Sequence, residues 1–179
     1  MIRSSIIRTA VCSLTLASAL ASSQPAGAHT PSQCWPKHGG DGGFSYFTGW
    51  RPTLLMRMAV WHGNVGFGNV INGIEWTYCG RDAAGNTFCD SQMVGRRLGT
   101  AGEFLINWMA GERLNLIRGR SGKYLDSIQV RTNTGRMSPL FGSQAPFSFS
   151  ESFGSEFIND FWGTSGNVVD SLGACTSLP

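Results

Sequence analysis

The stretch Thr164-Ser165-Gly166-Asn167-Val168-Val169-Asp170-Ser171-Leu172 contains the pattern that decides the fold. A glycine is followed by three residues, an acid or amide, a small residue and an aliphatic residue. The same pattern occurs in Arg120-Ser121-Gly122-Lys123-Tyr124-Leu125-Asp126-Ser127-Ile128 and in Gly66-Phe67-Gly68-Asn69-Val70-Ile71-Asn72-Gly73-Ile74. The motif glycines are 54 and then 44 residues apart, and each motif leads into a strand-like run. Three such copies indicate three similar β units around a pseudo-threefold axis.

The rest of the chain also consists of short runs separated by turn residues. Alternating apolar and polar residues at 54–60, 72–78 and 127–133 are typical of half-buried strands. The chain has 24 glycines, which suit tight turns and destabilise helix interiors. The best helical candidate, residues 103–117, is interrupted by Gly111. We therefore predict an antiparallel all-β sandwich, barrel or prism without an internal linker.

The N-terminus has the features of a cleavable secretory signal. Arg3 and Arg8 give a positive start, residues 9–21 are apolar or small, and Ala26-Gly27-Ala28 offers a signal-peptidase site. The alternative is a membrane anchor, but the uncharged run is shorter than the roughly 20 residues that span a bilayer. We expect a signal peptide at 1–28, a domain at 29–179 with its core at about 32–179, and a secreted, extracellular protein.

The mature chain is close to electrically neutral. Removing Arg3 and Arg8 from the 14 basic residues leaves 12, against 11 acidic residues. This balance provides no electrostatic footprint for nucleic acid or for an anionic membrane. No later stretch is long and apolar enough to span a bilayer. We therefore expect no nucleic-acid partner and no membrane insertion.

The mature chain keeps an even number of cysteines, because Cys12 leaves with the signal. Four remain: Cys34, Cys79, Cys89 and Cys175. In a secreted chain they indicate two disulfides, for which three pairings exist. Cys79 and Cys89 flank a predicted hairpin, and Cys34 and Cys175 lie near the two ends of the domain. This placement favours Cys79–Cys89 and Cys34–Cys175.

A metal site is the alternative use of these cysteines. No pair has the CxxC spacing, and His29, His38 and His62 do not cluster with them in sequence. We expect no metal and no cofactor.

Further segments follow one another in a characteristic order: Gly39-Gly40-Asp41-Gly42-Gly43-Phe44, Gly102-Glu103-Phe104-Leu105-Ile106, Arg131-Thr132-Asn133-Thr134-Gly135-Arg136, Pro139-Leu140-Phe141-Gly142, Pro146-Phe147-Ser148-Phe149, and Ile158-Asn159-Asp160-Phe161-Trp162-Gly163 leading into the last motif. They resemble, in order, the N-terminal GGxGG loop and the "GEYI", "TNxGR", "GPFG", "TPFSL" and "IxGFFGRSGxxLDAIG" motifs of the jacalin-like lectins. The resemblance runs from about Ser32 to the C-terminus. It implies the β-prism I fold, in which three four-stranded Greek-key sheets have pseudo-threefold symmetry.

A turn of the form G-x-x-x-D suits the chemistry of sugars. Vicinal hydroxyls need a carboxylate that accepts two hydrogen bonds and backbone N–H groups that donate, and glycine lets the backbone approach the ring. The resemblance assigns these roles to the turn Gly166–Asp170 and to the loop Gly42-Gly43. It implies that Asp170 accepts and that the N–H groups of Asn167, Val168 and Gly43 donate. The alternative is that Gly166 only makes a turn that Asp170 caps.

The other two turns are weaker candidates. The second turn keeps its acid, so Lys123, Tyr124 and Asp126 form a possible second sugar site, with Tyr124 able to stack on a sugar face. The loop opposite, residues 142–146, lacks a double glycine. The first turn has Asn72 in place of the acid, and an amide lacks the charge assistance of a carboxylate. We expect this turn to be structural.

The function implied by the resemblance is that of a lectin for mannose- or glucose-type glycans. The galactose-binding branch of the family is cleaved inside its N-terminal region, and nothing in this sequence indicates such processing. One shallow site is weak, near millimolar, so we expect avidity to come from several sites or from a possible homo-oligomer.

Two other classes of function compete with this interpretation. A secreted glycosidase needs a suitably spaced carboxylate pair, and no such pair or nucleophile motif is evident, so we expect no enzyme. A prism without a sugar site would be a structural or protein-interaction module. Its exposed patch would come from tryptophans that we otherwise expect mostly in the core: Trp35, Trp50, Trp61, Trp76, Trp108 and Trp162.

Overall fold

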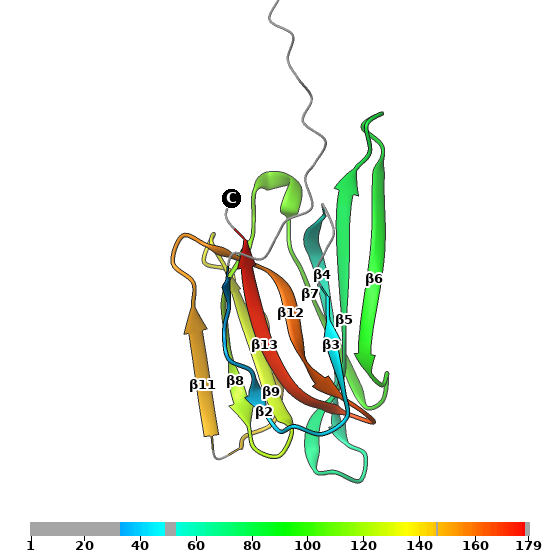
Figure 1. Cartoon of the computed structure of the whole chain (residues 1–179), viewed down its shortest axis with the longest axis vertical. Coiled ribbons are helices and arrows are strands. Elements are labelled where there is room, and N and C mark those ends of the chain that lie inside the picture. Colours follow the sequence, from blue (N-terminus) through cyan, green and yellow to red (C-terminus); the bar gives the residue numbers. More distant parts are fainter. Residues whose placement is uncertain (1–32, 49–52, 146, 178–179) are drawn as a thin grey trace, which may run out of the picture.

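Three long antiparallel hairpins form the body of the protein (Figure 1). The computed structural model describes residues 33–48, 53–145 and 147–177, so the predicted signal peptide and Trp50 lie outside the described residues. The hairpins are β4 (Leu54–Asn64) with β5 (Asn69–Arg81), β8 (Leu114–Ser121) with β9 (Leu125–Thr132), and β12 (Phe157–Ser165) with β13 (Val169–Ser177). Each of the three sequence motifs lies at the turn of one hairpin and runs into its second strand.

Each hairpin is completed by outer strands in the same spatial order. In the first unit, β6 (Thr87–Gly95) pairs with β5 and β7 (Thr100–Leu105) pairs with β4. In the second unit, β10 (Phe141–Gly142) pairs with β9 and β11 (Phe147–Ser152) pairs with β8. In both units the third strand therefore pairs with the second, and the fourth returns to pair with the first, which is a Greek key.

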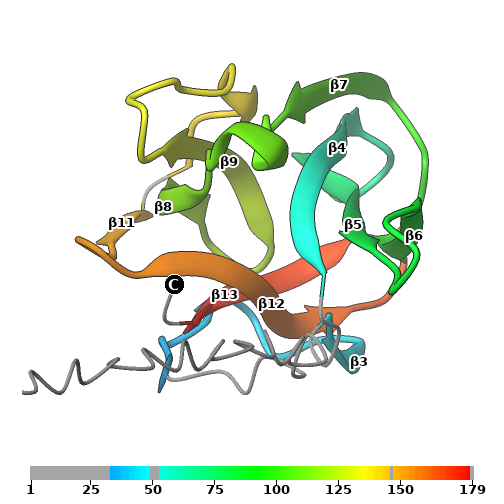
Figure 2. The same cartoon turned by 90° about the horizontal axis from the view of Figure 1, so that it is seen from above.

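The third unit takes its outer strands from the N-terminal part of the domain. Both β1 (Gln33–Cys34) and β2 (His38–Gly39) pair with β13, and β3 (Phe44–Phe47) pairs with β12. Seen along the long axis, the three units surround a common interior (Figure 2). This confirms the predicted all-β, threefold β-prism, with one difference in detail. A pairing of Ile158 with Leu114 joins the second and third units into one hydrogen-bonded sheet of nine strands, while the first remains a separate sheet of four.

The inner faces of the three units meet in an aromatic and aliphatic core. Trp76 of β5 stacks on Phe161 of β12 with ring centroids 5.0 Å apart, and both side chains are fully buried. Of the tryptophans that we expected mostly in the core, only Trp76 is fully buried within the described residues. The others there are half-buried: Trp35, Trp61, Trp108 and Trp162.

The burial of β5 differs from the alternation expected for residues 72–78. The strand is buried without interruption from Val70 to Gly80. Its polar side chains are covered in different ways. The Glu75 carboxylate binds the guanidinium groups of Arg57 and Arg97, the Thr77 hydroxyl bonds that of Ser91, and the Asn72 amide bonds loop carbonyls. Alternating polarity therefore did not translate into alternating exposure, since neighbouring strands and loops cover the polar positions.

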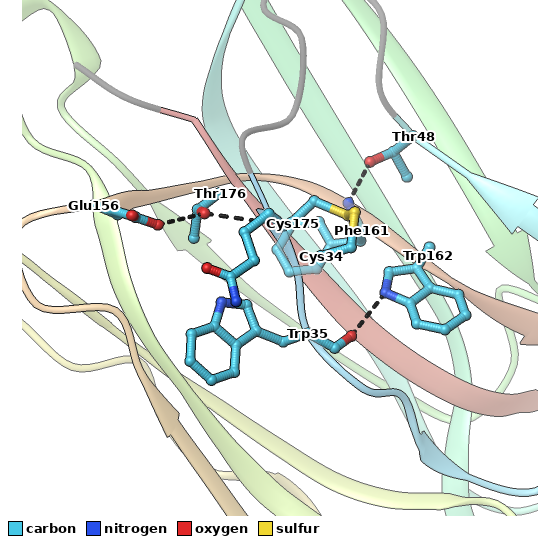
Figure 3. The surroundings of a disulfide bond; sticks show 9 residues. Cys34, Trp35, Thr48, Glu156, Phe161, Trp162, Cys175 and Thr176 are labelled. Atoms are coloured by element: carbon cyan, nitrogen blue, oxygen red, sulfur yellow. Dashed lines mark hydrogen bonds between the residues drawn. A yellow bond between two sulfur atoms is a disulfide. The ribbon is translucent and has the colours of Figure 1, made fainter.

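Both disulfides join the pairs expected from the sequence. Cys79–Cys89 connects β5 to its neighbour β6, and Cys34–Cys175 connects β1 to β13 across 141 residues (Figure 3). Next to the second bridge, the indole N–H of Trp162 donates to the carbonyl oxygen of Trp35 over 3.0 Å. The N-terminal segment is thus fastened to β13 by a covalent bond and by main-chain hydrogen bonds, and to β12 by the Trp162 side chain.

The region that was the best helical candidate, residues 103–117, contains the end of β7 and the start of β8, joined by a loop. Its middle forms only a short 3-10 turn, η1 (Trp108–Ala110), which ends at Gly111 in the left-handed conformation. Across the described ranges, no helix is long and apolar enough to cross a bilayer.

Candidate functional site

Three loops with the same geometry pack against the three motifs at one end of the prism (bottom of Figure 1). Each loop begins with a glycine in the left-handed conformation: Gly39, Gly95 and Gly142. The next N–H in each loop donates to the main-chain oxygen of the motif acid or amide over 2.7–3.0 Å: Gly40 to Asp170, Arg96 to Asn72, and Ser143 to Asp126. The pseudo-threefold relation therefore extends from the sequence pattern to individual hydrogen bonds.

In the third unit, the Asp170 carboxylate lies between two glycines. A Cβ on Gly42 would stand 2.5 Å from Oδ1, and a Cβ on Gly166 would stand 3.8 Å from Oδ2. Gly43 has φ 70° and lies so close to the Ser165 carbonyl that no side chain fits. The structure therefore brings the predicted loop and the predicted turn into direct contact around one carboxylate.

The electrostatics of Asp170 combine burial with a nearby positive charge. The residue is 6% exposed, and burial raises the pKa of its carboxyl above the ordinary value. The N–H of Gly166 and the ammonium of Lys123 act in the opposite direction on that pKa. The carboxylate is therefore desolvated but still supported as an acceptor.

The predicted donors lie on the same rim. Asn167 is exposed, whereas the Val168 side chain is buried and leaves only its main chain for a ligand. The turn is closed by a 3.0 Å hydrogen bond from the Gly166 N–H to the Val168 carbonyl. Within the described residues, the hydrogen bonds of loops and turns do not use the N–H groups of Gly43, Asn167 or Val168. A carboxylate acceptor and three main-chain donors are thus present in one small area.

A layer of hydroxyl groups supports the loop and turn from below. The Thr164 hydroxyl lies 2.8 Å from the Ser171 hydroxyl and 3.3 Å from the Gly40 carbonyl. The Tyr46 hydroxyl donates to the Ser171 carbonyl over 2.9 Å. Our sequence reasoning assigned no role to these residues. Thr164 lies two residues before the motif glycine and Ser171 is the small residue of the motif, but only strand pairing shows that they face each other.

The second turn repeats part of this arrangement. The N–H of Gly122 donates to the Tyr124 carbonyl over 2.9 Å. Burial raises the pKa of the Asp126 carboxyl above its ordinary value, while the nearby Gly122 N–H acts in the opposite direction. The Lys123 ammonium lies 5.4 Å from the centre of the Tyr124 ring, whose edge meets Phe67. Three possible second-site residues therefore share one turn, but Lys123 also influences Asp170 in the neighbouring unit.

The first turn is built differently from the other two. The pair His62–Ile71 corresponds to Ser165–Val169, the last pair of the third hairpin. Three residues separate Ser165 from Val169, but eight separate His62 from Ile71, because the first hairpin continues for two more pairs before it turns. Asn72 is fully buried, and its amide nitrogen donates to the carbonyls of Gly63 and Leu98. The amide is therefore used to hold its own loop.

The described part of the chain contains no group of three or more His, Cys, Asp and Glu residues placed to hold a metal ion.

Comparison with known proteins identifies the same architecture. The family model of the jacalin-like lectin domain matches residues 35–175. Myrosinase-binding protein 2 of Arabidopsis thaliana is 32% identical over 80 residues, which are 45% of this chain and 12% of that protein. The chain thus matches only a small part of that much longer relative.

Solved structures that resemble the chain include several lectins. The mannose-binding lectin from champedak has a TM-score of 0.68 at 19% identity, covering 83% of this chain and 99% of its own. Artocarpin in complex with methyl-α-mannose has a TM-score of 0.67 at 19% identity, covering 83% of this chain and 99% of its own. A mannose-binding jacalin-related lectin from Ananas comosus has a TM-score of 0.65 at 22% identity, covering 82% of this chain and 98% of its own. At these identities the likeness concerns the fold, and together with the family match it leads to one conclusion: the chain belongs to the jacalin-like lectin family.

Proposed function

We propose that the protein is a secreted lectin that binds mannose- or glucose-type glycans at the Asp170 turn. The observation that carries the proposal is the carboxylate enclosed between Gly42 and Gly166, with unused main-chain N–H groups beside it. Membership of a lectin family supports a sugar as the ligand.

The geometry suits two neighbouring hydroxyls of one sugar ring. Each hydroxyl donates to one oxygen of the Asp170 carboxylate, in charge-assisted hydrogen bonds that are stronger than neutral ones. The N–H groups of Asn167, Val168 and Gly43 donate to the same hydroxyl oxygens. Because the residues at 42, 43 and 166 are all glycines, the ring can approach the main chain closely.

Two arguments favour the mannose or glucose configuration. The Gly42-Gly43 loop follows Cys34 within the chain, and nothing in the sequence indicates the internal cleavage used by the galactose-binding branch. Artocarpin, which has the same fold, is solved with methyl-α-mannose. Export of the protein, expected from residues 1–28, would place the site where glycans are displayed.

Asp170→Asn tests the proposed site while keeping the shape of the side chain. Losing the charge assistance of two hydrogen bonds should weaken binding of methyl-α-mannose about tenfold or more, measured by NMR titration or calorimetry. Asp82→Asn is the matched control, because it makes the same change in the exposed turn between β5 and β6, outside both G-x-x-x-D turns, and should leave the affinity unchanged. Equal binding by wild type and Asp170→Asn would remove Asp170 from the site, and no glycan binding by either would favour the interaction module. Release of product from a glycan would instead indicate a glycosidase.

The pH dependence follows from the same carboxylate. Burial raises the pKa of Asp170, so the group takes up a proton at a higher pH than an ordinary aspartate. Protonation removes the charged acceptor, so sugar affinity should be full at neutral pH and fall as the pH is lowered. The Asp170→Asn variant should show no such fall.

A further inference from the structure

The outer face of the second unit has a cleft of about 390 Å³ that the proposed sugar site does not use. Its polar lining comes from β8, β9, β11 and the loop after β10: Arg118, Arg120, Ser127, Gln129, Gln144 and Ser148. Strand register places these side chains on one face, because Arg118 pairs with Gln129, and Arg120 pairs with both Ser127 and Ser148. The cleft is therefore a property of the sheet as well as of the loop beside it.

Two guanidinium groups give the cleft an uncompensated positive charge. Arg118 donates to the side-chain oxygen of Gln129 over 2.8 Å, and Arg120 donates to the carbonyl of Ala145 over 2.7 Å. Both partners are neutral, and no ion pair between described residues involves either arginine. In the first unit, by contrast, Arg57 and Arg97 form ion pairs with Glu75 and Glu103. The two arginines keep unused N–H donors, which match the oxygens of an anion.

A polar group without a partner lies beside the arginines. Gly119, between them in sequence, pairs with the buried Ile128 and Phe149, and a Cβ there would clash with the Ser127 carbonyl and the Phe149 ring. The Ser127 hydroxyl is fully buried and has no hydrogen-bond partner among the described residues. Its counterpart in the third unit, Ser171, is bonded to Thr164, but Arg120 occupies the position equivalent to Thr164. The second unit has therefore lost a structural hydrogen bond at the place where it carries positive charge.

Two residues of the cleft are neighbours in sequence of the Asp126 turn and of the loop bonded to it. Ser127 directly follows Asp126, and Gln144 directly follows Ser143, whose N–H bonds the Asp126 carbonyl. Arg120 itself lies two residues before Gly122, the first residue of the second G-x-x-x-D motif. Serine hydroxyls and glutamine amides around the arginines are suited to sugar hydroxyls.

We propose that this cleft binds the sulfate or carboxylate group of an acidic saccharide, whose neutral neighbour lies at the Asp126 turn. The guanidinium groups of Arg118 and Arg120 take the anionic group, while Gln144, Ser148 and Gln129 contact the ring that carries it. The placement of the neutral sugar rests on the proposed lectin function, whereas binding of the anion does not. Two arginines on a nearly neutral domain do not form the basic stripe that nucleic acid requires.

The test compares neutral with acidic saccharides. Dextran oligosaccharides, their sulfated forms and glucuronate oligosaccharides are titrated into the oxidised protein at low and at physiological salt. We expect the better acidic ligand to bind at least about tenfold more tightly than neutral dextran at low salt, equivalent to 1.4 kcal/mol. The amide NMR signals of Ser127 and Ser148 should shift with the acidic ligand alone. The sulfated and glucuronate arms show which anionic group is preferred.

Arg118→Gln should remove most of this gain, because Arg118 is exposed and no main-chain atom is held by its side chain. Arg131→Gln is the matched control, since it removes the same charge from β9 outside the lining of the cleft and should change affinity less than about twofold. Equal losses in the two variants would mean diffuse attraction and would overturn the proposal. Tighter Arg118-dependent binding of duplex DNA or anionic vesicles would also overturn it.

The two proposals fail separately. If methyl-α-mannose binds through Asp170 but charge brings no gain, the cleft proposal is wrong and the lectin function stands. If neutral sugars do not bind but sulfated dextran binds through Arg118, the anion site stands and the proposed sugar site does not.

Discussion

The absence of one methyl group at Gly42 determines where the Asp170 carboxylate can lie. A Cβ at this position would approach Oδ1 to 2.5 Å, closer than two such atoms can stand. Gly166, on the other side, leaves ordinary van der Waals room, since the nearest atoms to its Cβ would be 3.6 and 3.8 Å away. Neither glycine is in the left-handed region, so the two positions differ only in the space available to a Cβ.

This difference predicts unequal effects of the same substitution. Gly42→Ala should displace the carboxylate or the loop and reduce affinity for methyl-α-mannose about tenfold or more, a cost of at least about 1.4 kcal/mol. Gly166→Ala should fold with nearly unchanged stability and lose less affinity. Calorimetric titration with thermal unfolding of both variants provides the measurement. If Gly42→Ala binds as well as wild type, the carboxylate does not need the position described above.

At the scale of elements, the three hairpins show how a repeated motif can serve different ends. The main-chain bond from the loop to the motif residue occurs in all three units, but the side chain at that position differs in use. Asp170 faces a glycine loop, and Asp126 directly precedes Ser127 of the basic cleft. The Asn72 amide instead donates hydrogen bonds to the carbonyls of Gly63 and Leu98.

Replacing Asn72 by aspartate should therefore not turn the first turn into a sugar site. Asn72→Asp would place a buried carboxylate against two carbonyl oxygens and remove both hydrogen bonds, which we expect to lower the free energy of unfolding by about 2–4 kcal/mol. Asn69→Asp, an exposed position on the same hairpin, should change it by less than about 0.5 kcal/mol. Urea denaturation measures both. A stable Asn72→Asp protein with an additional mannose site would contradict this account.

At the scale of the whole molecule, the third unit is completed by strands from the opposite end of the chain. The Gly42-Gly43 loop lies between β2 and β3, whereas Asp170 lies at the start of β13. Cys34–Cys175 closes a separation of 141 residues between these two regions. The proposed sugar site therefore depends on closure of the prism, and the disulfide fastens that closure.

Removing the two disulfides should have different consequences. In the chain-entropy model, Cys34→Ser/Cys175→Ser costs about 5 kcal/mol and Cys79→Ser/Cys89→Ser about 3 kcal/mol. Only the first double variant should also weaken mannose binding, because only that bridge holds the loop strands against β13. Thermal unfolding and titration below the unfolding temperature separate the two effects. Unchanged binding after loss of Cys34–Cys175 would show that strand pairing alone positions the site.

The sequence by itself determined the threefold β architecture, the cysteine pairs and the candidate residues of the Asp170 turn, because these depend on local patterns: a repeated turn motif, glycine-rich loops and the positions of cysteines. It did not determine the buried outer face of β5, the longer first hairpin or the supporting bonds among Thr164, Ser171 and Tyr46. Nor did it indicate the cleft at Arg118 and Arg120. Those features arise where strands distant in sequence meet, and only the tertiary structure decides which side chains face each other there and which charges remain without a partner.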